Sequence, residues 1–275
     1  MAPMPALEHL SNPLATSAQL LKLKNTDDDE DTTTWFPQFM LTSGAGILLR
    51  LSQEVIAHAI VLLQRFLVSS TSNERRKFNA KNYSAAAIYL AAKISATPVS
   101  PRSVINVYAY LTSEASPLRF INLAGPPTDV KPQSYFVSEG GYERERQRLF
   151  VCESMILVGL GFDTRVALPY NLAFTYMQAL GVANTKLSQR VLEHLNAGLL
   201  SPQLLHLTHQ PNALAVGAIY LAARETGVKL VERNWWEVFD VDREDLGFLV
   251  LSYGSMANFA QAEMDKWKDG PLPFD

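Results

Sequence analysis

Several features on which other classes of protein depend are scarce in this sequence. Its 275 residues include a single cysteine, Cys152, which rules out an internal disulfide framework and a zinc site built on several thiolates. An excess of one charge is also lacking, since 24 Lys and Arg residues stand against 27 Asp and Glu residues. A balanced chain gives no field that holds a nucleic-acid backbone or an anionic membrane. We therefore expect a reducing compartment, no direct nucleic-acid binding, and a protein or small-molecule partner.

Long apolar runs are missing as well. The least charged stretch, 246–262, contains several polar residues and is too short to span a membrane, so it is interpreted as a buried helix. The first residues include Pro3, Pro5 and Glu8, where a secretory signal would need an apolar core. Alternating runs of β-branched residues are absent throughout. These absences favour an all-α protein without a membrane segment.

Helical periodicity dominates from Trp35 onward. Apolar residues recur at three-to-four spacing between Val55 and Leu67, as they do on one face of a helix. The Ala-rich stretch AAAIYLAAK (85–93) favours a helix that its neighbours can approach closely. The first half is thus predicted to hold five helices: one that ends near 51, then 55–67, the Ala-rich helix, 102–111, and about 143–160.

Two segments of the first half do not follow this periodicity. Residues 1–34 are rich in Pro, Ser, Thr and Asn and end in the acidic run 27–31, so we expect an extended or disordered N-terminal arm. Residues 115–141 contain repeated Pro and Gly and form a loop far longer than ordinary connections. Such a loop is either functional or disordered.

The second half repeats the plan of the first. Its helices are predicted at 171–180, 187–200, 212–225, 235–239, and 243 to about 266. The phrase AAIYLAAK (86–93) returns 131 positions later as GAIYLAAR (217–224), in the same place of the helix order. Such repetition indicates duplication. The sequence therefore predicts two tandem five-helix units, at 35–165 and 166–268, with a tail at 269–275.

Few patterns that carry enzyme chemistry survive inspection. The acidic run 27–31 contains the aspartate pattern by which all-α isoprenoid synthases hold magnesium, but it precedes the first helix, where its carboxylates could not line a cavity. His206 and His209 are spaced for one helix face, yet no third ligand accompanies them, and nearby prolines predict a surface loop. The glycines of GAG (44–46) do not join a strand to a helix, and Cys152 lies among apolar residues as a structural thiol does. We expect no catalytic residue, no metal and no cofactor.

Two charges stand out on helices that otherwise consist of packing residues. Glu153 lies one turn from Leu157, where an unpaired carboxylate would be costly, so it needs a cation. Lys93, at the carboxyl end of the Ala-rich helix, has a flexible stem that can reach it. In the second half Arg224 takes the place of Lys93, but 246–262 offers no carboxylate. From these residues alone, an internal salt bridge with no further role and a binding contact both remain open.

At these residues the chain resembles the cyclins, over roughly 36–268. In that family a Lys at the end of the third helix and a Glu in the fifth contact the regulatory helix of a kinase. Those positions fall on Lys93 and on Glu153, which opens the pattern E-x-x-x-L-x-x-L-x-F-D (153–163). The resemblance is closer still to cyclin L, on these phrases: AGILLRLSQ (45–53), LLQRFL (62–67), VINVY (104–108), LGF (160–162) and IYLAAR (219–224). NWWEVFDVD (234–242) resembles cyclin Q as much.

The resemblance implies two cyclin boxes and a non-catalytic regulatory subunit that binds and activates a cyclin-dependent kinase. It implies a nuclear role in RNA polymerase II transcription and pre-mRNA splicing, with splicing or transcription factors as further partners. Activation would come from holding the kinase's regulatory helix in place. The kinase-binding residues implied are Lys93, Ile94, Glu153, Leu157 and Phe162.

Three departures from the family pattern keep alternatives open. Ser95 and Ala96 stand where cyclins usually carry two acids, and Gln64 stands where cell-cycle cyclins carry Asp. The arginine and serine repeats of many cyclin L proteins are also absent from this sequence. The alternatives are a cyclin Q-like activator, a cyclin-box scaffold without a kinase, a DNA-binding scaffold of the TFIIB type, and an isoprenoid synthase. A single cysteine and a balanced charge weigh against the TFIIB type, which needs a zinc ribbon and a basic face.

Overall fold

All regular secondary structure in the described part of the chain is helical. The computed structural model describes residues 10–24, 35–70, 79–113, 116, 118, 135–230 and 234–266, and no strand occurs among them. The expected all-α class is therefore confirmed. The elements are α1 (Ser17–Lys24), α2 (Phe36–Leu48), α3 (Gln53–Ser69), α5 (Ala80–Ile94), α6 (Pro101–Leu111), α7 (Glu139–Gly159), α8 (Tyr170–Ala179), α9 (Thr185–Gly198), α10 (Leu205–Thr208), α11 (Pro211–Thr226), the 3-10 helix η3 (Trp235–Phe239) and α12 (Arg243–Lys266).

The chain divides into two compact units. One runs from Ala18 to Thr164 and includes the residues from Ala260 onward; we call it the first box. The other runs from Arg165 to Phe259 and includes the N-terminal residues up to Ser17; we call it the second box. The division after Thr164 lies one residue from the expected boundary, whereas the assignment of the two chain ends is not apparent from the repeat.

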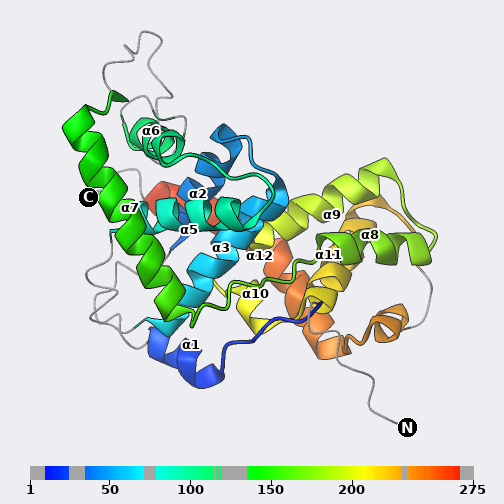
Figure 1. Ribbon diagram of the computed structural model, residues 1–275. Helices are drawn as coiled ribbons and strands as arrows, with labels where there is room; N and C mark the ends of the chain where they lie inside the picture. The colour runs from blue at the N-terminus through cyan, green and yellow to red at the C-terminus, as the bar shows by residue number, and fades with distance from the viewer. Residues whose placement is uncertain are drawn as a thin grey trace. The chain divides into compact units, whose positions relative to one another are not determined.

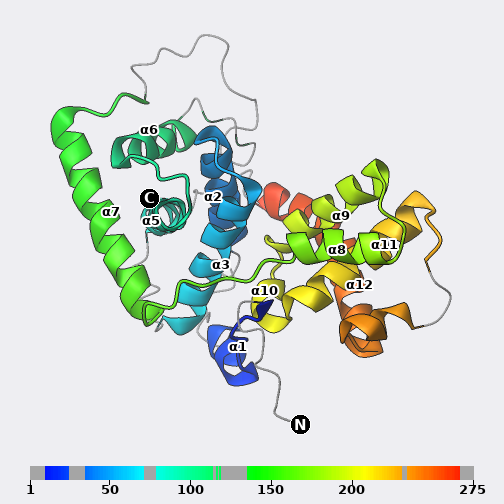
Figure 2. The ribbon, with the colours of Figure 1, turned by 45° about the vertical axis from the view of Figure 1, so that its right-hand side comes forward.

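The first box is built around α5. The side chain of Asn79 caps this helix by accepting a hydrogen bond from the backbone N–H of Asn82 at 3.1 Å. Ala86 and Ala87 are fully buried, which lets neighbours approach closely, and α2, α3, α6 and α7 all pack on α5. Figure 2 views α5 almost along its axis, with these four helices around it. The Ala-rich stretch is thus the centre of a five-helix unit.

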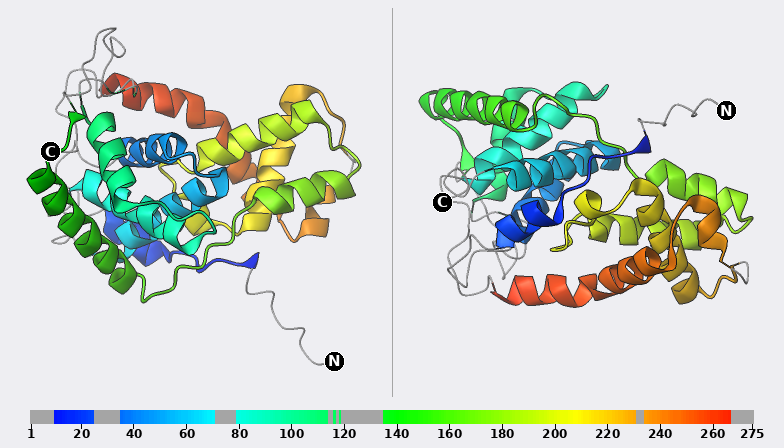
Figure 3. Two further views of the ribbon diagram at one scale, coloured as in Figure 1. Left: turned by 45° about the horizontal axis from the view of Figure 1, so that its top comes forward. Right: turned by 90° about the horizontal axis from the view of Figure 1, so that it is seen from below.

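The second box repeats this arrangement around α11, against which α8, α9, α10 and η3 pack (Figure 1). The fifth helix, α12, comes especially near: a Cβ placed on Gly217 would lie 2.9 Å from the Cβ of Leu249. In addition, the hydroxyl of Tyr253 donates to the carbonyl of Leu214 at 3.2 Å. Figure 3 shows α12 as a single long helix, orange to red. Gly217 is therefore required by the close approach of α12.

The N-terminal arm differs from the expected extended or disordered segment. Within its described part, α1 forms a helix and buries Leu23. Upstream of it, Asn12 is buried and makes two reciprocal pairs of hydrogen bonds: its side chain bonds the backbone N–H and C=O of Ala167, both at 2.8 Å, and its backbone bonds the amide of Gln210 at 2.9 and 3.0 Å. We call residues 10–16 the N-terminal clip. The acidic run 27–31 lies outside the described residues.

The fifth helix of the first box starts earlier than predicted. Helix α7 begins at Glu139, because the hydroxyl of Ser138 accepts a hydrogen bond from the N–H of Gly141 at 3.2 Å and so caps the first turn. Residues 139–141, expected in the long loop, are thus helical. Most of the remaining loop, at 115–134, lies outside the described residues. A short helix that was not predicted, α10, lies between α9 and α11.

Candidate partner-binding face

The two halves of α7 have very different surfaces. Its first half, EGGYERERQR (139–148), is polar, whereas its second half, LFVCESMILVG (149–159), is apolar on nearly every side. The inward residues Leu149 and Ile156 are buried, but Val151 and Val158 are 59% and 68% exposed. A helix that is apolar all round is normally buried on all sides. The second half of α7 therefore has an outer face that no described residue of the chain covers.

Lys93 and Glu153 meet at the edge of this face. The Nζ of Lys93 donates a hydrogen bond to Oε1 of Glu153 at 2.9 Å, from α5 to α7. The Glu153 side chain is 9% exposed and the Lys93 side chain is 57% exposed. The hydrogen bond to Glu153 raises the pKa of Lys93, whose ammonium also lies 5.6 Å from the ring centre of Tyr89. The expected cation for Glu153 is thus Lys93, and it remains open to solvent.

The three apolar residues proposed beside this pair differ in exposure. Ile94 ends α5 and is half-exposed, and Leu157 is half-buried. Phe162 follows the end of α7 by three residues. It is 69% exposed, and its backbone has a φ of +62°, a conformation that costs a non-glycine residue about 1–2 kcal/mol.

Two backbone hydrogen bonds close the turn after α7, just before and at Phe162. The N–H of Phe162 donates to the carbonyl of Leu157 at 2.8 Å, and that of Gly161 donates to the carbonyl of Val158 at 3.0 Å. This is the hydrogen-bond pattern of a Schellman motif, which satisfies the last carbonyls of a helix. The motif projects an aromatic ring into solvent at the end of the apolar face, at an energetic cost that packing within the chain does not repay.

Other exposed apolar residues on this face were not predicted. Val151, Met155 and Val158 form a stripe on the outside of α7, and Phe150 lies 6.1 Å from the ring of Tyr89. The sequence contained a sign of this exposed stripe, because apolar residues dominate every side of a helix formed by VCESMILVG. We call Lys93, Ile94, Phe150, Val151, Glu153, Met155, Leu157, Val158 and Phe162 the α7 face.

The second box has no equivalent of the ion pair. Arg224, the counterpart of Lys93, is exposed, and none of the described carboxylates lies within 4 Å of it. The adjacent Glu225 instead accepts hydrogen bonds across to α9, from Nε of Arg190 at 2.5 Å and at 2.8 Å from His194. The charge pairing of Glu225 therefore joins α11 to α9.

The two histidines expected at the surface are in fact inside the second box. His206 is fully buried, because Leu204 adopts a left-handed backbone (φ +51°) that turns α10 into the core. Burial lowers the pKa of His206 to about 4, and neither ring nitrogen has a hydrogen-bond partner in the described structure. His209 stacks on Phe248, with 5.2 Å between the ring centres. The expectation of surface histidines was wrong, since proximity to proline says nothing of side-chain direction.

The remaining candidates show no reactive environment. Cys152 is buried, and burial raises the pKa of its thiol to about 11, which keeps it protonated at neutral pH. Among the residues that the structure describes, no group of three or more His, Cys, Asp and Glu side chains could hold a metal ion. None of the described helices combines the length and apolarity needed to cross a bilayer.

Comparison with known sequences decides the family. No family model matches the chain. It is 29% identical over 243 residues to an uncharacterized cyclin-L1-like protein of Schizosaccharomyces pombe, covering 88% of both chains. It is also 30% identical to human cyclin-L2 over 227 residues and 32% identical to cyclin-T1-4 of Arabidopsis thaliana over 206 residues. The chain belongs to the cyclin family. Its resemblance to cyclin L is confirmed by these relatives, although this cyclin spans only 40% of the length of human cyclin-L2 and 34% of that of cyclin-T1-4.

Solved structures show the same fold. This cyclin superposes with a TM-score of 0.66 on a chain from the crystal structure of the yeast RNA Pol II CTD kinase CTDK-1 complex, covering 94% of this chain and 76% of that one. A chain of the Chaetomium thermophilum CAK complex bound to ATP-gamma-S gives a TM-score of 0.55, with 93% and 68% covered. Both are 14% identical in sequence, so the likeness concerns the fold. The expected architecture of two cyclin boxes is confirmed.

Proposed function

We propose that this cyclin is a non-catalytic subunit that binds and activates a cyclin-dependent serine/threonine kinase through the α7 face. The observation that carries the proposal is the uncovered apolar half of α7, with an ion pair at its edge. Exposed apolar patches of this kind mark protein interfaces. An aromatic ring and branched aliphatic side chains around a charge pair suit an interface with an apolar core and a few oriented polar contacts.

The ion pair can recognise backbone groups of a partner helix. The ammonium of Lys93 has three N–H donors, of which Glu153 takes one, and the carboxylate retains Oε2 as an acceptor. The exposure of Lys93 lets these groups reach a carbonyl and an N–H at the end of a helix. Lys93 stays charged near neutral pH in this role, because the hydrogen bond to Glu153 raises its pKa further above that range.

Activation then follows from differential binding. A kinase needs its regulatory helix in place so that a Lys and Glu pair of its own can align ATP. A partner surface that fits only the active position of that helix shifts the kinase population toward it. This cyclin would supply binding energy and rigid helices and no reacting group.

A nuclear role in RNA polymerase II transcription and pre-mRNA splicing is part of the proposal. It is supported by the resemblance to cyclin L and by the likeness to a chain of the RNA Pol II CTD kinase complex. Splicing or transcription factors would be further partners. Residues 95 and 96, Ser and Ala in place of the usual acids, also suit a cyclin-box scaffold without a kinase, which the test below separates.

The test is affinity purification of the tagged full chain from its source cells, followed by mass spectrometry and reconstitution with the kinase that co-purifies. Lys93→Glu and Glu153→Lys should each reduce kinase affinity and activation by more than tenfold. Arg224→Glu is the matched control, because it reverses a charge at the same place of the same helix in the second box. It should bind and activate as the native chain does.

The swapped double variant, Lys93→Glu with Glu153→Lys, separates a binding contact from an internal salt bridge. It restores an ion pair between α5 and α7 but presents reversed charges to the kinase. We expect it to recover thermal stability and not kinase binding. Recovery of binding would show that the pair has only a structural role, and purification without any kinase would favour the scaffold.

A further inference from the structure

A cavity lies at the end of the first box opposite to Lys93. It has a volume of about 270 Å³ and is lined by the first two turns of α5, by α6, by residues 136–138 and by the first three turns of α7. Lys81 is the second residue of α5 and Lys93 nearly ends it, so about 18 Å of helix separates Lys81 from the ion pair. On α7, the cavity-lining Leu149 lies one turn, about 6 Å, before Glu153. The cavity therefore borders the α7 face at Leu149 but shares no residue with it.

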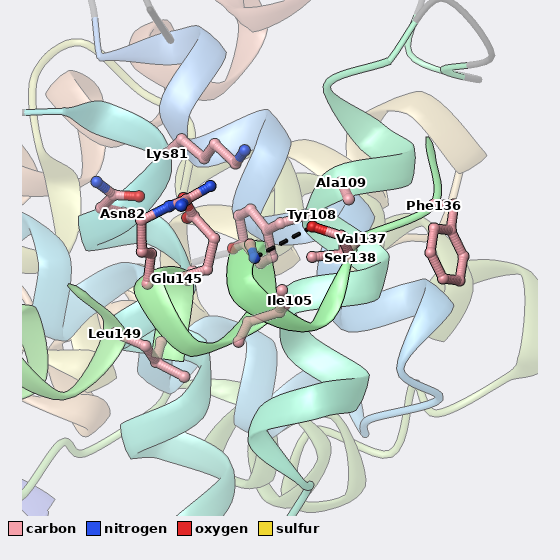
Figure 4. A pocket seen from close by; sticks show the side chains of 13 residues that line it. Lys81, Asn82, Ile105, Tyr108, Ala109, Phe136, Val137, Ser138, Glu145 and Leu149 are labelled. Atoms are coloured by element: carbon pink, nitrogen blue, oxygen red, sulfur yellow. Dashed lines mark hydrogen bonds between the residues drawn. The ribbon is translucent and has the colours of Figure 1, made fainter. Parts of the chain in front are cut away.

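The inner wall of the cavity is apolar and rigid. Ile105 and Ala109 of α6, Leu149 of α7 and the ring of Tyr108 line it. Figure 4 shows Ile105 and Tyr108 between Lys81 and Asn82 on the left and Phe136 and Val137 on the right, with Leu149 below Asn82. The Tyr108 hydroxyl lies 2.6 Å from the hydroxyl of Ser84, which is itself 2.7 Å from that of Thr42. This buried network keeps the floor in place.

The mouth of the cavity is cationic. Glu145 lines it, but its carboxylate accepts a hydrogen bond from Arg148 at 2.7 Å. Lys81 and Arg144 also line it, and in the described structure no carboxylate pairs with either. The net charge that faces a ligand is therefore positive, which favours an acidic partner.

Two aromatic residues, Tyr135 and Phe136, lie beside this mouth, and we call them the aromatic lip. Phe136 lines the cavity and is 77% exposed, and the neighbouring Tyr135 makes an edge contact with Tyr110 at 5.2 Å between ring centres. Large exposed aromatic side chains at the rim of a pocket are typical of binding surfaces. The lip thus widens the contact beyond the cavity itself.

The size of the cavity indicates the kind of ligand. Sites for drug-sized molecules and cofactors enclose about 300–1,000 Å³. A volume of about 270 Å³ lies below this range and suits one large apolar side chain better than a whole cofactor. We infer that this cavity is a docking site for a short acidic peptide segment of a partner protein, with one large apolar side chain in the cavity and flanking carboxylates on Lys81 and Arg144. The partner would be a protein that this cyclin holds at the same time as the α7 face is occupied.

Direct binding to the purified full chain tests this without any kinase, so it can fail or succeed independently of the proposed function. The probe is a fluorescein-labelled peptide, Glu-Glu-Phe-Glu-Glu, measured by fluorescence anisotropy. We expect saturable binding with a Kd below about 1 mM that weakens with salt. Replacing the Phe by Ala, or every Glu by Lys, should weaken binding at least tenfold. Equal binding of all three peptides, or none by the first, would overturn the inference.

Variants of the chain locate the site. Lys81→Glu should weaken the acidic peptide at least fivefold. Its matched control is Lys186→Glu, which reverses an exposed charge at the same second position of a helix, α9, and should leave binding unchanged. Ala109→Phe fills the cavity and should abolish binding, with helical content measured alongside. Binding that survives both Lys81→Glu and Ala109→Phe would contradict the assignment, and equally tight binding of N-acetylphenylalanine would indicate a small-molecule site instead.

Discussion

The two copies of the central helix use nearly the same residues to different ends. In the first box the terminal cation, Lys93, pairs with an acid on the fifth helix of its box. In the second box the terminal cation, Arg224, is exposed, and the adjacent Glu225 bonds to Arg190 and His194 on α9. Duplication thus preserved the packing helix while the charges around it were redistributed. The comparison teaches that the repeated phrase specifies the fold and that its flanks specify the surface.

The start of the repeated phrase also differs between the two boxes. Ala86 in the first box corresponds to Gly217 in the second, where a Cβ would lie 2.9 Å from Leu249 of α12. The fifth helix of the second box therefore packs close to α11 at Gly217. In the first box α7 also packs on α5, with the buried Ala86 at the corresponding place.

The largest difference expected between the boxes is in acid stability. The folded-state pKa of His206 is about 4, below its ordinary value near 6.5, so the folded protein favours the neutral ring. The stability this contributes is present above pH 6.5 and is lost as the pH falls toward 4, by about 3 kcal/mol in all. His206→Leu should flatten the fall of the melting temperature over this range in calorimetry.

The first box provides the control for that experiment. Burial also lowers the pKa of His58, but its Nε2 lies 2.7 Å from the carbonyl of Thr164, and this hydrogen bond opposes the shift. His58→Leu should therefore change the acid dependence less than His206→Leu. An equal effect of the two variants would show that the missing hydrogen-bond partner of His206 does not distinguish the boxes.

Exchanging Ala and Gly at the start of the repeated phrase is expected to change stability less than the protonation of His206 does. Gly217→Ala introduces a Cβ against that of Leu249, which has no flexible end to move, and should destabilise the second box by about 1–2 kcal/mol despite the better helix propensity of Ala. Ala86→Gly should cost about 1 kcal/mol in the first box. Urea unfolding of each variant measures this. A more stable Gly217→Ala chain would mean that α12 can shift and that its close approach is not fixed.

The smallest effect is expected from removing the terminal cations. Lys93→Met leaves Glu153 without its cation and should destabilise the first box by about 1 kcal/mol, because the Lys side chain is more than half exposed. Arg224→Met should change stability by less than about 0.5 kcal/mol. Chemical denaturation at pH 7 is suitable, since the hydrogen bond to Glu153 raises the pKa of Lys93 and keeps it charged there. If the two variants lost equal stability, the charge pair would not distinguish the first box from the second.

The sequence was informative wherever burial imposed a pattern. Helices α3 and α6 lie within two residues of their expected limits, because their apolar spacing leaves one inward face. The Lys93 and Glu153 pair was predictable for a related reason: a carboxylate among packing residues must find a cation, and a single lysine was in reach.

What the sequence did not reveal depends on side-chain direction and on distant contacts. Helix α1 was missed because its apolar residues lie among polar ones, and only Leu23 is buried. The start of α7 depends on a hydroxyl rotamer of Ser138, and the burial of His206 depends on the left-handed Leu204. The bonds of Glu225 to α9 require the two helices to cross at one particular place. None of these follows from periodicity.

The N-terminal clip has a consequence for how the protein is made. Asn12 leaves the ribosome before its partner Gln210, which is synthesised 198 residues later. At about 5–20 residues per second, this leaves an interval of about 10 to 40 seconds. Helices α2 to α7 of the first box are complete in sequence long before the clip can close, so they can pack together before residues 10–16 reach their partners. Residues 10–16 are thus among the last parts of the second box to be put in place.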